Sequence, residues 1–245
     1  MLLRFLLLLA LCGVLGCANQ RPVVYQSRLA EVVRPSDQGD SFSAPVVTTQ
    51  DDEGRDEYVF EDDLLRATWV PLTTAILYSI ENRDNQSIKV LWNEAAFVDT
   101  KGLATRIMLE GQRFADRLAT LPPSVVPRGG QITGTLVPSN RVRDTPTGWQ
   151  VDSIIEPSNV PSNDATDALA NVGETFSVTI PVEVRGVVQE YMFTFQVTSA
   201  LVSTGRKRER GSVEADGGLS TPVIVSLSGL GILLAVLLVS VASRE

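Results

Sequence analysis

The chain has 245 residues, 44% of them hydrophobic and 20% charged, with a formal net charge of -8. These values are typical of a folded chain with one sizeable core rather than a disordered one. The negative balance disfavours general nucleic-acid binding, so we expect no nucleic-acid partner. Histidine is absent, which excludes Ser-His-Asp and Cys-His nucleophiles and histidine-ligated zinc. An enzyme would have to use carboxylates, lysine or tyrosine.

The first 16 residues have the features of an export signal. Arg4 supplies one positive charge, residues 5–11 are apolar, and small residues occur just before Cys17. At about 1.5 Å per residue the apolar stretch is too short to span a bilayer. We therefore expect residues 1–16 to be a signal peptide that is removed on export.

Val14-Leu15-Gly16-Cys17 resembles the lipobox of bacterial lipoproteins. The resemblance implies that the Cys17 thiol takes a diacylglycerol and that a signal peptidase then cuts before Cys17. The alternative is a plain secretory signal with Cys17 as an ordinary thiol. Cys12 fits less well, because the large Leu11 would stand at the cut. Since the sequence holds two cysteines, the exported domain has no thiol with which to form a disulfide.

Residues 17–56 are expected to form a flexible tether that begins at the lipidated Cys17. The stretch is polar and keeps no period for long, apart from short strand-like pieces at residues 23–25 and 46–49. Eight acidic residues then lie between Asp51 and Asp63, against Arg55 alone. The spacing of a calcium loop is missing, so a solvated run at the domain edge is favoured, and neither a metal nor a cofactor is expected.

Alternation of apolar and polar residues predicts the strands of the domain. It covers residues 64–70, 75–81, 88–92 and 131–137, and residues 95–99 and 103–109 are expected as the two arms of a hairpin. Turn residues 82–86 and 100–102 predict two hairpins. A third hairpin, residues 175–184 and 187–198, gives the strongest signal, with Arg185-Gly186 as its turn. Its second arm places four apolar side chains on one face: Tyr191, Phe193, Phe195 and Val197.

The remaining stretches are less regular. Residues 112–120 form either a short helix or an irregular segment, and residues 151–155 are expected to form a strand. Proline-rich residues 122–130 cannot be a central strand, because proline lacks the N–H donor, so they form a crossing or an edge. Residues 156–172 are expected to form a long polar loop.

About eight or nine short strands over residues 57–200 predict an all-β fold, an antiparallel β-sandwich of immunoglobulin-like type. The strand at residues 88–93, the crossing that ends at Gly130 and the closing hairpin resemble the immunoglobulin-like domains of uncharacterised bacterial envelope lipoproteins. The resemblance is one of pattern and implies no site residue. Trp69 and Trp92 are expected in the core.

Residues 222–242 carry no charge and would extend about 31 Å as a helix, close to the thickness of a bilayer. A C-terminal transmembrane helix is therefore expected. An alternative is a sorting tail that is removed after export, although such tails end in several basic residues and this one has only Arg244.

The positive-inside rule places the basic linker, residues 201–221, in the cytoplasm, whereas the export signal places it outside. We prefer the export signal, because long domains translocate largely regardless of charge.

The basic linker holds four clustered cations, which are Arg206, Lys207, Arg208 and Arg210. We interpret the basic linker first as a solvated juxtamembrane segment. The alternatives are a contact with anionic headgroups or cell-wall polymer, and a protease-sensitive site.

Two membrane signals around one β domain predict a membrane-anchored envelope lipoprotein of a bacterium. Its non-catalytic sandwich would face the periplasm or the exterior and bind a protein or a cell-envelope polymer. One alternative is a subunit of an envelope assembly that pairs its edge strands with a neighbour. Another is a hydrolase that uses two of Asp99, Glu110 and Asp116. In the lipoprotein resemblance, Ala18 after Cys17 lacks the Asp retention signal, which implies the outer membrane, whereas the apolar helix favours the inner one.

Overall fold

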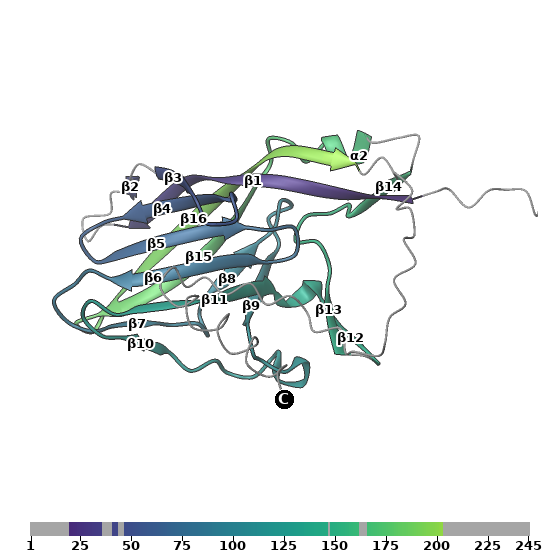
Figure 1. Cartoon of the computed structure of the whole chain (residues 1–245). Coiled ribbons are helices and arrows are strands. Elements are labelled where there is room, and N and C mark those ends of the chain that lie inside the picture. Colours follow the sequence, from purple (N-terminus) through teal and green to yellow (C-terminus); the bar gives the residue numbers. More distant parts are fainter. Residues whose placement is uncertain (1–19, 36–40, 44–46, 147, 162–165, 203–245) are drawn as a thin grey trace, which may run out of the picture.

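The structure, a computed structural model, describes residues 20–35, 41–43, 47–146, 148–161 and 166–202 (Figure 1). Strands dominate this part of the chain, and every strand pairing in it is antiparallel. Fourteen of these strands join in one hydrogen-bonded sheet, and two others form a separate ribbon. The described chain is therefore an antiparallel all-β structure, as the alternation predicted.

One layer of the molecule is built around its two longest strands. Its members are β1 (Gln20–Pro35), β2 (Ser41–Ser43), β7 (Ile88–Val90), β8 (Ala96–Val98), β10 (Ser124–Val126), β14 (Asn159–Pro161), β15 (Thr175–Val184) and β16 (Val187–Val202). The order is β14, β1, β16 and β15, and β15 then pairs with both β7 and β8. β10 pairs with β7, and β2 pairs with β1.

The second layer continues the same ladder, because β9 pairs with β8 and also with β11. Its members are β3 (Val47–Gln50), β4 (Asp56–Glu61), β5 (Leu65–Pro71), β6 (Ile76–Asn82), β9 (Ala104–Leu109) and β11 (Gln131–Pro138). The ribbon consists of β12 (Val142–Thr145) and β13 (Gly148–Val151). Three short helices of the described chain lie in the connections: η1 (Phe114–Asp116), η2 (Ser139–Arg141) and α2 (Thr166–Leu169).

Aromatic side chains from the two layers meet in the core. The ring of Trp69 on β5 lies 4.6 Å from that of Phe193 and 6.0 Å from that of Phe195, both on β16. Phe60 on β4 lies 5.9 Å from Phe193. These rings belong to opposite layers, so the ladder folds back on itself and buries the apolar face of each half against the other (Figure 1).

Two predicted hairpins are confirmed, β8–β9 and β15–β16. The turn of the second has positive φ at both central residues, 54° at Arg185 and 80° at Gly186, as a two-residue hairpin turn of this hand requires. The inward face is also as predicted, and its residues are at most 1% exposed: Tyr191, Phe193, Phe195 and Val197. Trp69 and Trp92 are buried, as expected for core residues.

The hairpin expected between residues 75–81 and 88–92 does not form. Both edges of β6 are occupied, by β5 and β11, so the chain after the turn crosses to the other layer. There β7 pairs with β15 and β10. Asn82 is 1% exposed, and its side-chain amide donates to the carbonyls of Gln86 and Val126, which fixes the crossing.

The flexible tether expected over residues 17–56 is wrong for residues 20–35. They form β1, which lies between β14 and β16 and pairs with β16 from Val23 to Val33. The domain thus begins well before residue 57. The pairing has two register shifts, one that skips Thr198 on β16 and one that skips Ala30 on β1. The second changes which face of β1 is buried, so the period of two of an ordinary strand does not continue from Leu29 to Val32.

The irregular stretches are partly as expected. Residues 112–120 hold the 3-10 helix η1, and the proline-rich crossing contributes β10, which pairs with β7. The strand expected over residues 151–155 is displaced, because β13 ends at Val151. The polar loop at 156–172 contains β14 and α2.

No helix among the described residues is long and apolar enough to cross a membrane. The predicted signal peptide and the predicted transmembrane helix at 222–242 fall outside the described residues.

Candidate functional site

The site residues singled out in the sequence lie outside the described part of the chain. They are Cys17 and the basic cluster of Arg206, Lys207, Arg208 and Arg210. The described residues nearest to them in sequence are Gln20, the first residue of β1, and Val202, the last residue of β16.

The three carboxylates considered for hydrolysis each have a local partner. Asp99 accepts hydrogen bonds from the backbone N–H groups of Lys101 and Leu103 and so closes the β8–β9 turn. Glu110 accepts from the Thr135 hydroxyl, and Asp116 forms an ion pair with Arg113. These hydrogen bonds and ion pairs link each carboxylate to a different neighbour and do not join any two of the three.

The acidic run at residues 51–63 contains two carboxylates that shape turns. Asp51 accepts from the backbone N–H groups of Glu53 and Arg55 and pairs with the Arg55 guanidinium at 2.6 Å. Burial alone would raise the pKa of Asp51, but these hydrogen bonds and the charge of Arg55 outweigh it and lower that pKa. Asp51 is therefore ionised at neutral pH and stabilises the β3–β4 turn in that form.

Asp62 is the buried member of the same run, with a side chain only 4% exposed. Its Oδ1 accepts from the backbone N–H groups of Leu64 and Leu65, and its Oδ2 accepts from Arg34 at 2.7 Å and from the Tyr191 hydroxyl at 2.9 Å. The expectation of a solvated acidic run is therefore wrong at this position. The cluster connects β1, the β4–β5 turn and β16, and so joins the two layers.

Tyr191 completes this polar cluster from within the core. Burial raises the pKa of Tyr191, and the neighbouring charge of Asp62 raises it further, while the hydrogen bond from Arg34 acts in the opposite direction. The Tyr191 hydroxyl thus remains protonated and donates to Asp62 at neutral pH. The arrangement is a structural ion pair with all four acceptor positions of the carboxylate in use.

A groove of about 410 Å³ lies between β1, the β3–β4 turn and the end of β5. Tyr25 and Tyr58 form part of its wall, and both hydroxyls have partners. That of Tyr25 donates to the Pro157 carbonyl at 2.9 Å, and that of Tyr58 donates to the Ser27 carbonyl at 3.2 Å. Burial raises the pKa of both tyrosines, so they stay neutral at physiological pH.

The rest of the groove wall offers hydrogen-bonding groups, which belong to Gln26, Arg55, Asp56, Thr73 and Thr198. The Arg55 guanidinium is held by Asp51 and Glu53, so its charge is compensated. Such a wall suits a polar ligand segment that forms several hydrogen bonds, and the groove is our candidate binding site.

Sequence reasoning missed both the groove and the Arg34–Asp62–Tyr191 cluster. Their members lie far apart in the chain: Arg34 and Tyr191 are separated by 157 positions. Comparison of the chain with protein-family models, with curated proteins and with solved structures finds no match.

Proposed function

We propose that the protein is a membrane-anchored lipoprotein of a bacterial cell envelope, and that its non-catalytic, immunoglobulin-like sandwich binds a protein or a cell-envelope polymer. One observation carries the proposal. The lipobox-like Val14-Leu15-Gly16-Cys17 is followed almost at once by Gln20, the first residue of a strand that is built into the domain. A lipid on Cys17 would therefore fasten the domain directly.

The apolar segment 222–242 supplies the second anchor of this proposal, as a transmembrane helix. The diacylglycerol on Cys17 would contribute two acyl chains, and a spanning helix is effectively permanent, so the two anchors together would keep the domain on its membrane. The export signal places the domain in the periplasm or at the exterior.

Replacement of Cys17 tests the lipid anchor. In cells grown with radioactive palmitate, the Cys17→Ser variant is expected to lose the label, and the Cys12→Ser variant, which changes the other cysteine, is expected to keep it. Equal labelling of Cys17→Ser and the unaltered protein would contradict the proposal.

The groove beside the β3–β4 turn supports the binding part of the proposal, because its wall presents hydrogen-bonding groups from four separate strands or turns. A photo-crosslinking residue at Thr73, in the groove, is expected to give an adduct in intact cells. The matched position is Val125, which is exposed on β10 and does not line the groove. Adducts of equal yield at both positions would count against the groove.

A second candidate function, assembly through strand pairing, rests on β3. Its four residues are uncharged and exposed, and within the described chain β3 pairs with β4 on one side. Uncharged edge strands of this kind can accept another strand. Size-exclusion chromatography in detergent tests this candidate: a homo-oligomer that Thr48→Pro converts to monomer supports it, and a monomeric unaltered protein dismisses it for self-assembly.

A further inference from the structure

The two ends of the described chain lie at one end of the molecule. β1 runs away from Gln20 and β16 runs back toward Val202, and the two strands pair, with Val23 opposite Val202 and Val24 opposite Leu201. Figure 1 shows the start of β1 and the end of β16 toward its right-hand side. The lipobox cysteine precedes the first of these ends, and residues 203–221 connect the second to the apolar segment 222–242.

The chain between Cys17 and Gln20 is short. Whatever its conformation, three steps of about 3.6 Å allow a separation of about 11 Å at most. A lipid on Cys17 would therefore hold this end of the domain close to the headgroups, without the reach of a long tether. This step rests on the proposed lipidation.

Other segments gather at the same end. The backbone N–H of Val23 donates to the Ser158 carbonyl at 2.8 Å, and the Asn171 side chain, just after α2, donates to the Tyr25 hydroxyl at 3.1 Å. Asn171 also lines a hollow of about 530 Å³ with Lys101 of the β8–β9 turn. The start of β1, the end of β16, the α2 segment and the β8–β9 turn thus form one surface, which we name the anchor end.

Several apolar side chains of the anchor end are exposed to solvent. Their exposed fractions are between 42% and 58%: Val24, Leu103, Leu169, Val172 and Leu201. They come from four separate segments, and Val24 and Leu201 are direct cross-strand partners. Apolar side chains of this kind gain free energy when they enter the interface of a bilayer.

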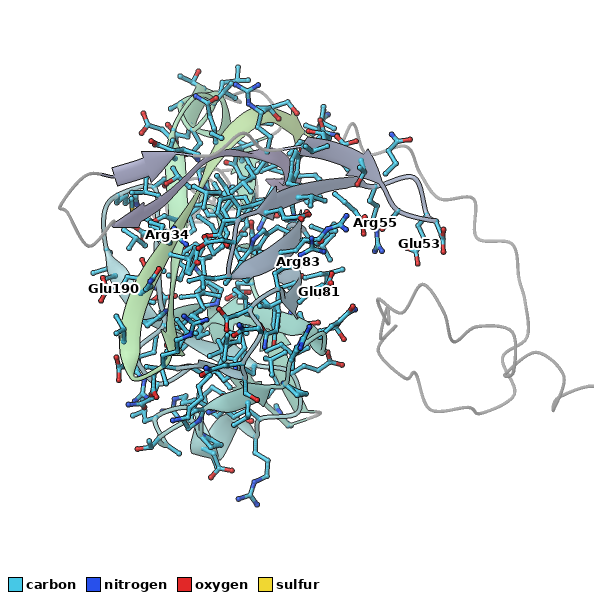
Figure 2. All side chains as sticks on the ribbon, turned by 90° about the vertical axis from the view of Figure 1, so that its left-hand side faces the viewer. Arg34, Glu53, Arg55, Glu81, Arg83 and Glu190 are labelled. Atoms are coloured by element: carbon cyan, nitrogen blue, oxygen red, sulfur yellow. The ribbon has the colours of Figure 1, made fainter. Side chains whose placement is uncertain are left out.

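The opposite end of the molecule carries ionic pairs as well as two exposed apolar side chains, Val187 and Val188. Figure 2 labels two of its charged residues, Arg83 and Glu81, which pair at 3.7 Å. Arg83 pairs with Glu61 at 2.9 Å, and Arg185 of the β15–β16 turn pairs with Asp84 of the β6–β7 turn at 3.0 Å. From end to end β16 contains 16 residues, which at about 3.3 Å per residue separate the two ends by roughly 50 Å.

We propose that the anchor end lies against the lipid surface of the membrane and that the sandwich stands on it, with the β6–β7 and β15–β16 turns facing away. The bilayer surface is the partner of the exposed apolar residues. The Tyr25 side of the groove then lies nearer to the lipid than to the far turns, so a ligand of the groove is recognised close to the membrane.

Single-cysteine labelling tests this orientation, because the mature domain has no cysteine besides Cys17. Full-length protein purified from membranes, carrying Leu169→Cys or the matched Val187→Cys, is labelled with a maleimide fluorophore. Both native side chains are exposed, at 57% and 51%, so both variants are expected to fold. The labelled proteins are reconstituted in vesicles of phosphatidylethanolamine and phosphatidylglycerol that contain a headgroup nitroxide.

The expected result is severalfold stronger quenching of the label at position 169 than of the label at position 187. Equal quenching, or stronger quenching at 187, overturns the orientation. The chain without an added cysteine is the control, because an acylated Cys17 thioether cannot react with maleimide. Reaction of that chain with the maleimide overturns the proposed lipidation and the orientation that rests on it. Equal quenching with an unreactive Cys17 overturns the orientation alone, so the two failures are distinguishable.

Discussion

At the scale of single residues, the acidic run illustrates how neighbouring carboxylates acquire different roles. Asp62 is buried and accepts from Arg34, whereas Asp63, the next residue, is 73% exposed and accepts from the same guanidinium. Removing one partner of an ion pair that is shielded from water lowers the free energy of unfolding strongly, because the remaining charge is left buried without a partner. An exposed ion pair contributes little to the free energy of unfolding.

Replacing these two aspartates should therefore give unequal losses of stability. Asp62→Ala is expected to lower the free energy of unfolding by about 2 to 4 kcal/mol, because Arg34 and two backbone N–H groups lose their acceptor. Asp63→Ala, the matched neighbour, is expected to lower it by less than about 1 kcal/mol. Urea denaturation of the two variants measures both values, and equal losses would contradict the buried role of Asp62.

The lowered pKa of Asp51 predicts that the stability of the protein depends on pH. Its pKa is lowered in the folded protein, so its contribution is complete above the unfolded pKa of about 3.9 and is lost as the pH falls through the folded pKa. Asp51→Asn is expected to reduce stability at pH 7 by about 0.5 to 1 kcal/mol, and this loss is expected to shrink as the pH falls below about 3.9. Urea denaturation over a range of pH measures the difference between the two proteins, and a difference that grows as the pH falls would exclude this role.

At the scale of elements, β1 is the main departure from what the sequence predicts. Its buried residues are Val23, Tyr25, Leu29 and Val32. The first three keep an even spacing, and the register shift at Ala30 makes the last spacing odd, so a single period of two does not cover the strand. A strand with such interruptions has the sequence pattern of a linker, although its backbone hydrogen bonds hold it inside the sheet.

Substitutions of two valines in β1 distinguish a strand from a tether at residues 20–35. Val32 is 0% exposed and Val24 is 43% exposed. Val32→Ala is expected to lower the free energy of unfolding by about 2 kcal/mol through the lost packing and the cavity, and Val24→Ala by less than about 0.5 kcal/mol. Thermal and urea denaturation provide the measurement. If residues 20–35 were a tether, neither substitution would change stability.

At the scale of the whole molecule, the pairing of Val23 with Val202 predicts that the domain tolerates circular permutation. A permuted chain would link Val202 to Gln20 and open between Lys101 and Gly102, two exposed residues of the β8–β9 turn. A linker of about five glycine and serine residues should suffice, because the ends are adjacent. Cooperative unfolding monitored by circular dichroism is the readout. Ends on opposite sides, roughly 50 Å apart, would instead require about 15 residues.

The sequence by itself determined the fold class and the local hairpins. Period-two alternation and turn chemistry act between neighbours in the chain, so they predict the β15–β16 and β8–β9 hairpins and the inward face of Tyr191, Phe193 and Phe195. The same local patterns predict an export signal, a lipobox cysteine and an apolar C-terminal segment, which stay predictions.

Tertiary structure alone decided which strands become neighbours. It placed β1 between β14 and β16, moved β7 from β6 to β15, and brought Arg34 to Asp62 and Tyr191. The physical reason is that each of these contacts depends on edges left free by other strands and on residues distant in the chain. The position of both chain ends at one end of the molecule, and hence the anchor end, follows from the same non-local pairing.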